Sequence, residues 1–333
     1  MMNGTRRIMK EVLSLLEGRS VKALEQARKE LLSIDVQSIK ARKALEYYAE
    51  NWNDIIHPGI LSLACEAVGG DPETIVPVQV ALLLVNAAID IHDDIIDQSK
   101  TKNGRQTVFG KFGEKIALLL GDAMLIRGLI LLNDSLKHFP HEIAKNVVST
   151  FQKYLFELGN AHLYEIDFME TFDASPLRYF HVLEKKGSII GMLMRIGAIV
   201  GGGVYEQIES LGNYGEILGT LIAIREEFID IFEQDELKSR LENKYPPLPV
   251  LCASNNPRVK RLIYYVSTRP KISNSLIERL IEAVFRDNKV KELIEKMHDM
   301  SREALKHIKK LRLKKSLEYQ LKIILLGIFE DLQ

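Results

Sequence analysis

Four aspartates lie close together in an otherwise apolar stretch of the chain: Asp90, Asp93, Asp94 and Asp97. On a helix of 3.6 residues per turn these positions are related by steps of three and four, so their side chains gather on one face. Like charges at this spacing repel one another unless a cation lies among them or the face is open to water. Carboxylate oxygens are the ligands that hard divalent cations such as magnesium prefer. The spacing therefore favours a metal site, with a solvated acidic face as the alternative.

A second acidic cluster, Glu226, Glu227 and Asp230, follows much later in the chain. It repeats the acid-acid-x-x-acid spacing of the first cluster, and Glu226 and Asp230 share one helix face. Two such helices facing each other could hold cations that neutralise the charge of a diphosphate. The repetition predicts a binding site for a diphosphate with magnesium.

Long helices must position both clusters. Apolar residues recur mostly at three- and four-residue spacings, strand signals are nearly absent, and Gly, Pro and Asn separate the long segments. Typical helix lengths then predict an all-α bundle of roughly ten or more helices. The two most apolar segments, Ile75–Ile91 and Ile116–Leu132, contain polar residues and are short for a membrane span. We expect them to be buried core helices and the protein not to span a membrane.

The composition is that of an ordinary globular protein. The chain has 333 residues, 46% hydrophobic and 27% charged, and we expect a single domain over residues 1–333. Lys+Arg and Asp+Glu both number 45, so no global field favours nucleic acid as a partner. The two cysteines, Cys65 and Cys252, lie far apart, and the N-terminus lacks the long apolar run of a signal peptide. These features predict a cytoplasmic protein.

Longer stretches of the chain resemble the trans-prenyl diphosphate synthases, and geranylgeranyl or polyprenyl diphosphate synthases in particular. The two aspartate-rich motifs of that family correspond to residues 93–97 and 226–230. Further similar stretches follow in the family's order at residues 63–70, 107–108, 111–113, 120–123 and 214–219. Residues 1–50 and 256–333 match less well. The resemblance implies the all-α isoprenoid synthase fold around a central cavity, and a homodimer packed through helices.

The resemblance also implies roles for individual residues. In the family the first motif carries magnesium to an allylic prenyl diphosphate, and the second motif completes the set of metal ligands. The implied metal ligands are Asp93, Asp94, Asp97, Glu226 and Asp230. The resemblance implies catalytic roles for Asp93, Asp94 and Lys186. Lys186 corresponds to the family's diphosphate-binding lysine, and the next residue, Gly187, stands where the family usually has threonine. The implied substrate-binding residues are Lys102, Lys186, Arg225, Lys244, Ala87, Ala88 and His57.

Several departures from the family pattern fall in the site for the second substrate, isopentenyl diphosphate. The family's Gly-Lys-Arg-x-Arg-Pro sequence is Asn53-Asp54-Ile55-Ile56-His57-Pro58 here, and a further arginine is Asn103. Arginine forks donate charge-assisted hydrogen bonds to phosphate that these residues cannot replace. We therefore expect a degenerate isopentenyl diphosphate site and a retained allylic site. Glu226-Glu227 replace an aspartate pair, and the added methylenes are expected to shift or weaken metal binding.

These features favour a magnesium-dependent prenyltransferase that passes a prenyl group to an acceptor without a diphosphate, such as an aromatic or other alcohol. Three alternatives stay open: a chain-elongating polyprenyl diphosphate synthase, a terpene-cyclase-like enzyme, and a non-catalytic partner subunit of a synthase. The persistence of both acidic clusters argues against the partner subunit.

The length of the donor is predicted from Ala87 and Ala88, which lie one to two helical turns before Asp93. A hydrocarbon anchored at the acids has to extend past these positions, where the resembling family uses a bulky aromatic to stop short chains. Two alanines leave the path open, which predicts a prenyl diphosphate of about twenty carbons or more. The alternative is that the alanines only permit close helix packing.

Two histidines near these motifs have competing interpretations. His92 directly precedes the acids, but on a helix it points away from Asp93 and Asp94, which favours a packing or hydrogen-bonding role over that of a general base. His57, with Trp52, either lines the altered acceptor site or packs at the start of a helix.

Overall fold

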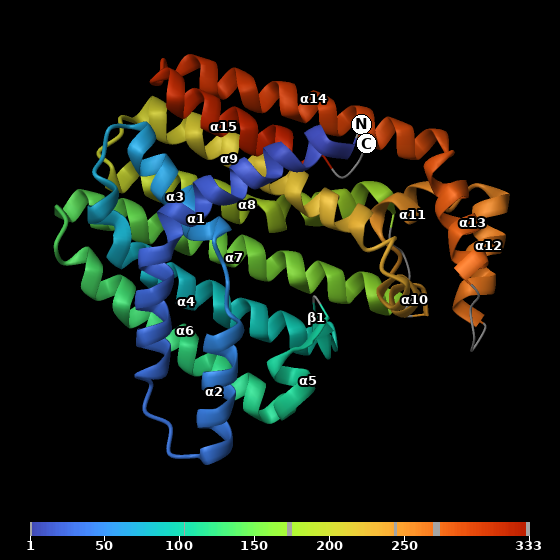
Figure 1. Ribbon diagram of the computed structural model, residues 1–333, viewed down its shortest axis with the longest axis horizontal. Helices are drawn as coiled ribbons and strands as arrows, with labels where there is room; N and C mark the ends of the chain where they lie inside the picture. The colour runs from blue at the N-terminus through green and yellow to red at the C-terminus, as the bar shows by residue number, and fades with distance from the viewer. Residues whose placement is uncertain (1, 103, 172–174, 243–244, 269–273, 331–333) are drawn as a thin grey trace. The chain divides into compact units, whose positions relative to one another are not determined.

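The computed structural model describes residues 2–102, 104–171, 175–242, 245–268 and 274–330, and most of them are helical (Figure 1). This part of the chain forms 15 helices and one hairpin, whose two strands have two residues each. The all-α prediction is thereby confirmed. The helices are α1 (Met2–Leu32), α2 (Ile39–Asn51), α3 (Ile56–Ala67), α4 (Pro72–Ile96), α5 (Val108–Phe112), α6 (Glu114–Leu136), α7 (His141–Thr171), α8 (Pro176–Val200), α9 (Tyr205–Ile229), α10 (Gln234–Glu242), α11 (Leu248–Ala253), α12 (Pro257–Thr268), α13 (Asn274–Phe285), α14 (Asn288–Lys310) and α15 (Lys315–Gly327). The strands β1 (Thr101–Lys102) and β2 (Arg105–Gln106) pair antiparallel.

Backbone contacts divide the chain into two compact units. Unit 1 comprises residues 1–9, 149–195 and 206–333, and unit 2 comprises residues 10–148 and 196–205. Helices α7 and α8 each contribute residues to both units. The expectation of a single domain stays a prediction.

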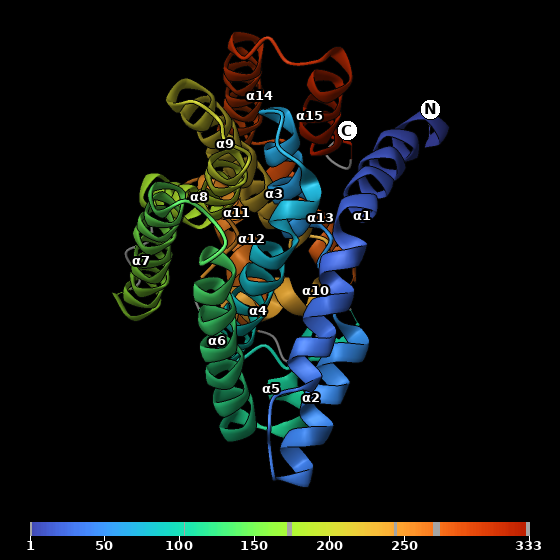
Figure 2. The same cartoon turned by 90° about the vertical axis from the view of Figure 1, so that its left-hand side faces the viewer.

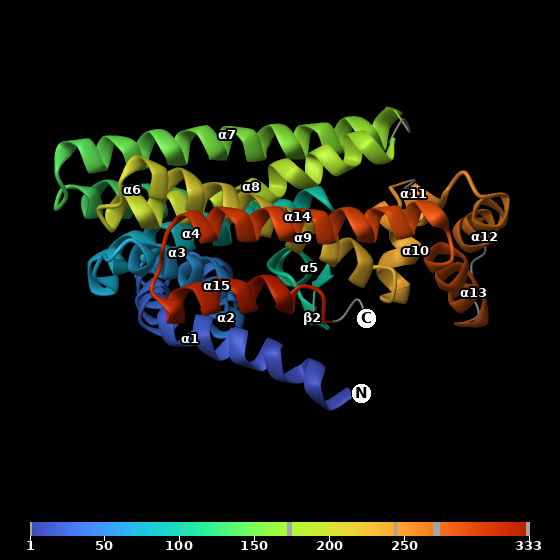
Figure 3. The ribbon, with the colours of Figure 1, turned by 90° about the horizontal axis from the view of Figure 1, so that it is seen from above.

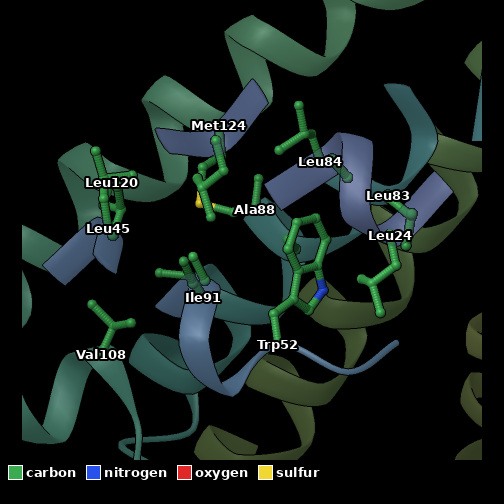
Figure 4. Close-up of a cluster of buried hydrophobic side chains, with 14 of the residues drawn as sticks. Leu24, Leu45, Trp52, Leu83, Leu84, Ala88, Ile91, Val108, Leu120 and Met124 are labelled. Atoms are coloured by element: carbon green, nitrogen blue, oxygen red, sulfur yellow. The ribbon is translucent and has the colours of Figure 1, made fainter. Parts of the chain in front are cut away.

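The core of unit 2 lies between α4 and α6, which run side by side (Figures 1 and 2). Glycine permits their close approach, since a Cβ atom on Gly128 would lie 3.0 Å from the carbonyl oxygen of Ala81. Leu84, Ala88, Ile91 and Met124 fill this region together with side chains from α1 and α2 (Figure 4). Each fully buried aliphatic side chain stabilises the fold by roughly 1.5–3 kcal/mol, so this cluster fixes α4 firmly.

The ends of α4 are defined by local hydrogen bonds. Asp71 caps the N-terminus, where its carboxylate accepts a hydrogen bond of 2.9 Å from the backbone N–H of Glu73. At the C-terminus Gln98 has a φ of 55°, which turns the chain out of the helix and into the β1–β2 hairpin. The Thr107 hydroxyl then donates to the carbonyl of Ser99 at 2.7 Å, which closes the loop. The hairpin is thereby held beside the last turn of α4.

The two apolar helices of unit 2 differ in burial. Both α4 and α6 are long and apolar enough to cross a membrane by length and composition alone, but α4 is 72% buried in its most apolar window and α6 only 33%. The prediction of a buried core helix is therefore confirmed for α4 and wrong for much of α6. One stripe of α6 packs on α4, whereas its other face exposes five large apolar side chains, Leu118, Leu119, Ile126, Leu129 and Ile130.

In unit 1, α8 and α9 approach each other through glycines. A Cβ atom on Gly187 would lie 2.2 Å from the backbone nitrogen of Thr220, and one on Gly219 would lie 1.9 Å from the carbonyl oxygen of Gly187. No other residue fits at Gly187 without moving a helix, which explains why threonine is absent there. Helices α14 and α15 lie side by side and follow the short pair α12 and α13 (Figure 3).

Candidate active site

The four aspartates of the first cluster occupy the last two turns of α4 and its C-cap. The core-facing residues Ala87, Ala88 and Ile91 are buried, whereas the acids are half-buried or exposed, so the acids share the open face of the helix. Burial raises the pKa of Asp94 to about 7, and the charges of Asp90, Asp93 and Asp97 add to the effect against the opposing charge of Lys102. The four carboxylates therefore lie near one another, as the spacing predicts.

Lys102 lies beside this cluster because the β1–β2 hairpin returns toward the end of α4. Its Nζ atom is 3.5 Å from Oδ1 of Asp90, and its side chain is 53% exposed. Burial opposes the charged form of Lys102, but the carboxylates of Asp90, Asp94 and Asp93 outweigh it and raise its pKa. Lys102 is thus a half-exposed cation next to the acids.

His92 points to the opposite side of α4. Its Nε2 atom lies 3.2 Å from a carboxylate oxygen of Asp122, without the alignment of a hydrogen bond, and a Cβ atom on Gly121 would lie 2.5 Å from it. The imidazole therefore packs against α6. The prediction of a packing role, and not of a general base beside the acids, fits this contact.

Two residues that depart from the family pattern, Asp54 just before α3 and His57 in its first turn, are bonded to each other. Nδ1 of His57 lies 2.8 Å from Oδ2 of Asp54, and Nδ2 of Asn86 on α4 donates to the same oxygen at 3.1 Å. Trp52 is 6% exposed and its ring packs on that of Tyr48, with 5.5 Å between centroids. Trp52 is therefore a core residue, whereas the side chain of His57 is 28% exposed.

The second cluster, at the end of α9 in unit 1, is organised differently from the prediction. Glu226 is exposed and pairs with Arg225, whose Nη1 atom lies 3.0 Å from its carboxylate. Glu227 is buried: it accepts hydrogen bonds from Tyr179 at 2.7 Å and from the backbone N–H of Leu248 at 2.7 Å. The cluster thus has one exposed and one buried glutamate.

Arg240 of α10 neutralises the buried part of this cluster. Its two Nη atoms donate to the two carboxylate oxygens of Glu227 at 3.1 and 3.0 Å, and Nη1 also donates to Asp230. Nη2 further donates to the hydroxyl of Tyr179 at 2.9 Å, and Nε donates to the carbonyl of Tyr245 at 3.2 Å. All five N–H donors of the guanidinium are therefore used.

The pairing with Arg240 changes what Asp230 can do. Burial raises the pKa of Asp230 to about 6, with Glu227 and Glu236 adding to it and Arg240 opposing it. Oδ2 of Asp230 accepts from Arg240, so a cation at Asp230 would use Oδ1 or share Oδ2 with the guanidinium. The assignment of Glu226 and Asp230 as metal ligands stays a prediction.

Lys186 on α8 forms an ion pair with Glu165 on α7. Glu165 also accepts a hydrogen bond of 2.6 Å from the Tyr245 hydroxyl, and Nδ1 of His162 lies 3.4 Å from it. Burial opposes the charged form of Glu165, but His162, Lys186 and Tyr245 outweigh it and lower its pKa to about 2. Lys186 is thus held at a fixed position by a fully charged partner. The predicted substrate residue Lys244 lies outside the described residues, as does position 103.

The donor set fits magnesium better at the first cluster than at the second. The carboxylates of Asp93, Asp94 and Asp97 lie on one face of α4, where burial, with a smaller contribution from the neighbouring carboxylates, raises the pKa of Asp94. Hard cations such as magnesium prefer such oxygen ligands. Within the described ranges, no three His, Cys, Asp or Glu side chains already converge closely enough to hold a metal ion. Asp93, Asp94 and Asp97 are the residues that would hold a cation at α4.

The predicted path of the prenyl tail is closed in this structure. Ala87 and Ala88 have no exposed surface, and Ala88 packs among Leu84, Ile91 and Met124 (Figure 4). These contacts fit the alternative, in which the alanines permit close helix packing. That the tail passes them stays a prediction.

The comparisons with known proteins agree with the all-helical architecture. The fold matches a geranylgeranyl pyrophosphate synthetase from Geoglobus acetivorans with a TM-score of 0.81 at 23% identity, over 94% of this chain and 99% of that one. It matches equally a geranylgeranyl pyrophosphate synthase from Corynebacterium glutamicum complexed with isoprenyl diphosphate and magnesium, with a TM-score of 0.79 at 18% identity, over 96% and 98%. These likenesses define the all-α isoprenoid synthase fold.

The sequence matches place the chain in a family. The sequence model of the polyprenyl synthetase family matches residues 40–283, so the chain belongs to that family of prenyltransferases. A short chain isoprenyl diphosphate synthase from Methanothermobacter thermautotrophicus is 27% identical over 229 residues, which are 68% of this chain and 69% of that protein. The resemblance inferred from the motifs is thereby confirmed.

Proposed function

We propose that this chain is a magnesium-dependent prenyltransferase that takes its prenyl group from a long allylic diphosphate and passes it to an acceptor other than isopentenyl diphosphate. The observation that carries the proposal is the Asp54–His57 pair. At these two positions the family pattern has a lysine and an arginine for the second diphosphate. A carboxylate in their place repels a diphosphate, since like charges in a partly buried site interact strongly.

The donor side of the proposal rests on α4 and its hairpin. Asp93, Asp94 and Asp97 would hold magnesium, which neutralises charge on a leaving diphosphate when bound. Lys102, exposed beside Asp90, would swing onto the diphosphate and add a charge-assisted hydrogen bond. Lys186 is assigned to the diphosphate by the family resemblance alone, and that role stays a prediction.

Chain elongation with isopentenyl diphosphate is the second candidate. It is favoured by the similar proteins, which are isoprenyl and geranylgeranyl diphosphate synthases. It requires other cations to replace the missing lysine and arginines.

One assay separates the two candidates. The purified chain is incubated with geranylgeranyl diphosphate and magnesium, alone, with isopentenyl diphosphate, or with a cell extract that supplies acceptors. Released diphosphate is quantified, and prenylated products are identified by mass spectrometry. We expect diphosphate release that depends on magnesium. We expect a new prenylated product only in the mixture that contains the extract. Efficient elongation with micromolar isopentenyl diphosphate would overturn the proposal, and no release in any mixture would favour the non-catalytic subunit.

We also propose that the active form is a homodimer in the cytoplasm. The five apolar side chains exposed on α6 form a continuous stripe that a second copy of the chain would cover. The two free thiols, Cys65 and Cys252, suit a reducing compartment.

A further inference from the structure

The pair formed by Asp54 and His57 has the geometry of an oriented base. The Nδ1 atom of His57 lies 2.8 Å from Oδ2 of Asp54. A carboxylate bonded to Nδ1 fixes the tautomer with the proton on Nδ1, which leaves the lone pair on Nε2. No residue in the described part of the chain hydrogen-bonds to that Nε2 atom, and the side chain is 28% exposed. The free nitrogen of the ring is therefore available to a ligand.

A hydrogen bond to the first turn of α3, whose N-cap residue is Ile55, accounts for only part of this arrangement. Oδ1 of Asp54 accepts a hydrogen bond of 3.2 Å from the backbone N–H of His57 in the first turn of α3. Oδ2 is not needed for this hydrogen bond, yet it is shared between His57 and Nδ2 of Asn86, which donates to it at 3.1 Å. The second oxygen is thus dedicated to orienting the imidazole, and Asn86 fixes it from a different helix.

The pair lies along the same face of α4 as the acids. Asn86, Asp90 and Asp94 are spaced by four residues, so they form one row, with Asp90 roughly 6 Å and Asp94 roughly 12 Å along the axis from Asn86. The charge of Asp90 acts on His57, and the charges of Asp90, Asp54 and Asp94 all act on the buried hydroxyl of Tyr48. An acceptor next to His57 would therefore lie between Asn86 and a diphosphate at Asp93 and Asp94.

We propose that His57 accepts the proton of a hydroxyl group on the prenyl acceptor, an alcohol or a phenol, and that Asp54 positions it. In this step the C1–O bond of the allylic diphosphate breaks and its electron pair leaves with the diphosphate. The acceptor oxygen forms a bond to C1, and its proton passes to Nε2 of His57. The products are a prenyl ether, diphosphate and an imidazolium that returns its proton to water. This inference rests on the proposed function, which leaves the acceptor open.

The charged groups around His57 set the expected pH dependence. Burial lowers the pKa of His57, but the carboxylate of Asp54 outweighs it and Asp90 adds to the effect, so the pKa is raised above its usual value. No cationic group contributes to this shift in the pKa of His57. Tyr48 stays neutral because burial and the nearby carboxylates raise its pKa. Because only the neutral imidazole accepts a proton, ether formation should rise with pH through this raised pKa.

The test compares ether formation with diphosphate release in the same reaction. The full chain receives geranylgeranyl diphosphate and magnesium with phenol or benzyl alcohol as the probe. His57→Gln should lower the ratio of ether formed to diphosphate released by about 100-fold or more. Asp54→Asn keeps an oxygen that can accept from the backbone N–H of His57. It should lower the pH at which ether formation rises toward the usual pKa of histidine. His181→Gln is the matched control, because His181 forms the same i,i+3 pair with Glu184 on the surface and should change neither readout.

Equal ether formation in wild type and His57→Gln overturns the inference, as does a wild type that releases diphosphate but makes no ether with either probe. An unchanged pH limb in Asp54→Asn overturns the role of Asp54. If the wild type releases no diphosphate, the proposed function is wrong, but the inference about His57 can still be tested. In that case ¹⁵N NMR shows which ring nitrogen of His57 carries the proton. A proton on Nδ1 of His57 and a shift of Nε2 on titration with phenol would support it. A proton on Nε2 would overturn it.

Discussion

Replacing Arg240 by methionine should destabilise the protein strongly. The side chain is 11% exposed and its guanidinium is the counter-charge of Glu227, which is 8% exposed, and of Asp230. Removal leaves a buried carboxylate without its cation and strips one hydrogen bond each from Tyr179 and Tyr245. Breaking a buried ion pair from one side costs about 3–5 kcal/mol, so we expect a loss of that size in the free energy of unfolding.

Urea unfolding followed by circular dichroism measures this loss. The surface pair of Arg302 with Asp299 on α14 supplies the control, because both side chains are about two-thirds exposed and Arg302→Met should cost at most about 1 kcal/mol. The double variant Arg240→Met with Glu227→Gln removes both charges. Its loss in the free energy of unfolding should be smaller than the sum of the two single losses by roughly 0.5–3 kcal/mol. A loss below about 1 kcal/mol in Arg240→Met, or strict additivity in the double variant, would refute this account of the second cluster.

Four further outcomes are expected. Asp94→Asn removes a hard oxygen ligand and should lower magnesium-dependent diphosphate release by about 100-fold, measured with a pyrophosphate assay; wild-type turnover would contradict the metal site. Glu165 has a folded pKa of about 2, below its unfolded value, so it stabilises the protein above the unfolded pKa and this contribution is lost as pH falls toward 2. Glu165→Gln should therefore lose less stability than wild type between about pH 5 and 2 in acid unfolding. Ile126→Glu places a charge on the exposed apolar stripe of α6 and should convert a dimer to a monomer in light scattering, whereas an unchanged mass would rule out this interface. Ala88→Phe should cost about 1–3 kcal/mol by overpacking the closed cluster; an undiminished stability with a preference for shorter donors would instead support the tail path.

Local spacing was sufficient to predict the first cluster. Asp93, Asp94 and Asp97 share the open face of α4 because helical periodicity fixes both the acids and the apolar residues that bury the opposite face. The same argument predicted that His92 points away from Asp93 and Asp94, and in the structure it packs against α6. These features depend on residues within two helical turns, which a sequence pattern contains.

The second cluster shows where such reasoning stops. The i,i+4 spacing of Glu226 and Asp230 is real, but Glu227 is the residue that organises the site, through Arg240 from α10 and Tyr179 from α8. These partners come from different helices, and no spacing in the sequence connects them to α9. Likewise, hydropathy predicted that both apolar helices are buried, but it does not distinguish a core helix from one with an apolar outer face. Only packing separates α4 from α6 in this respect.

The departures from the family pattern argue against simple decay of the second substrate site. A decaying site loses one cation at a time and leaves the remaining polar groups without partners, which costs about 1–3 kcal/mol for each buried group. Here the lysine and arginine positions hold Asp54 and His57, which bond to each other, and Asn86 completes the set from α4. Gly187 likewise replaces a threonine where α8 and α9 are in backbone contact. Because Asp54, His57 and Asn86 satisfy one another, this arrangement supports the proposed enzyme with a different acceptor over an inactive subunit.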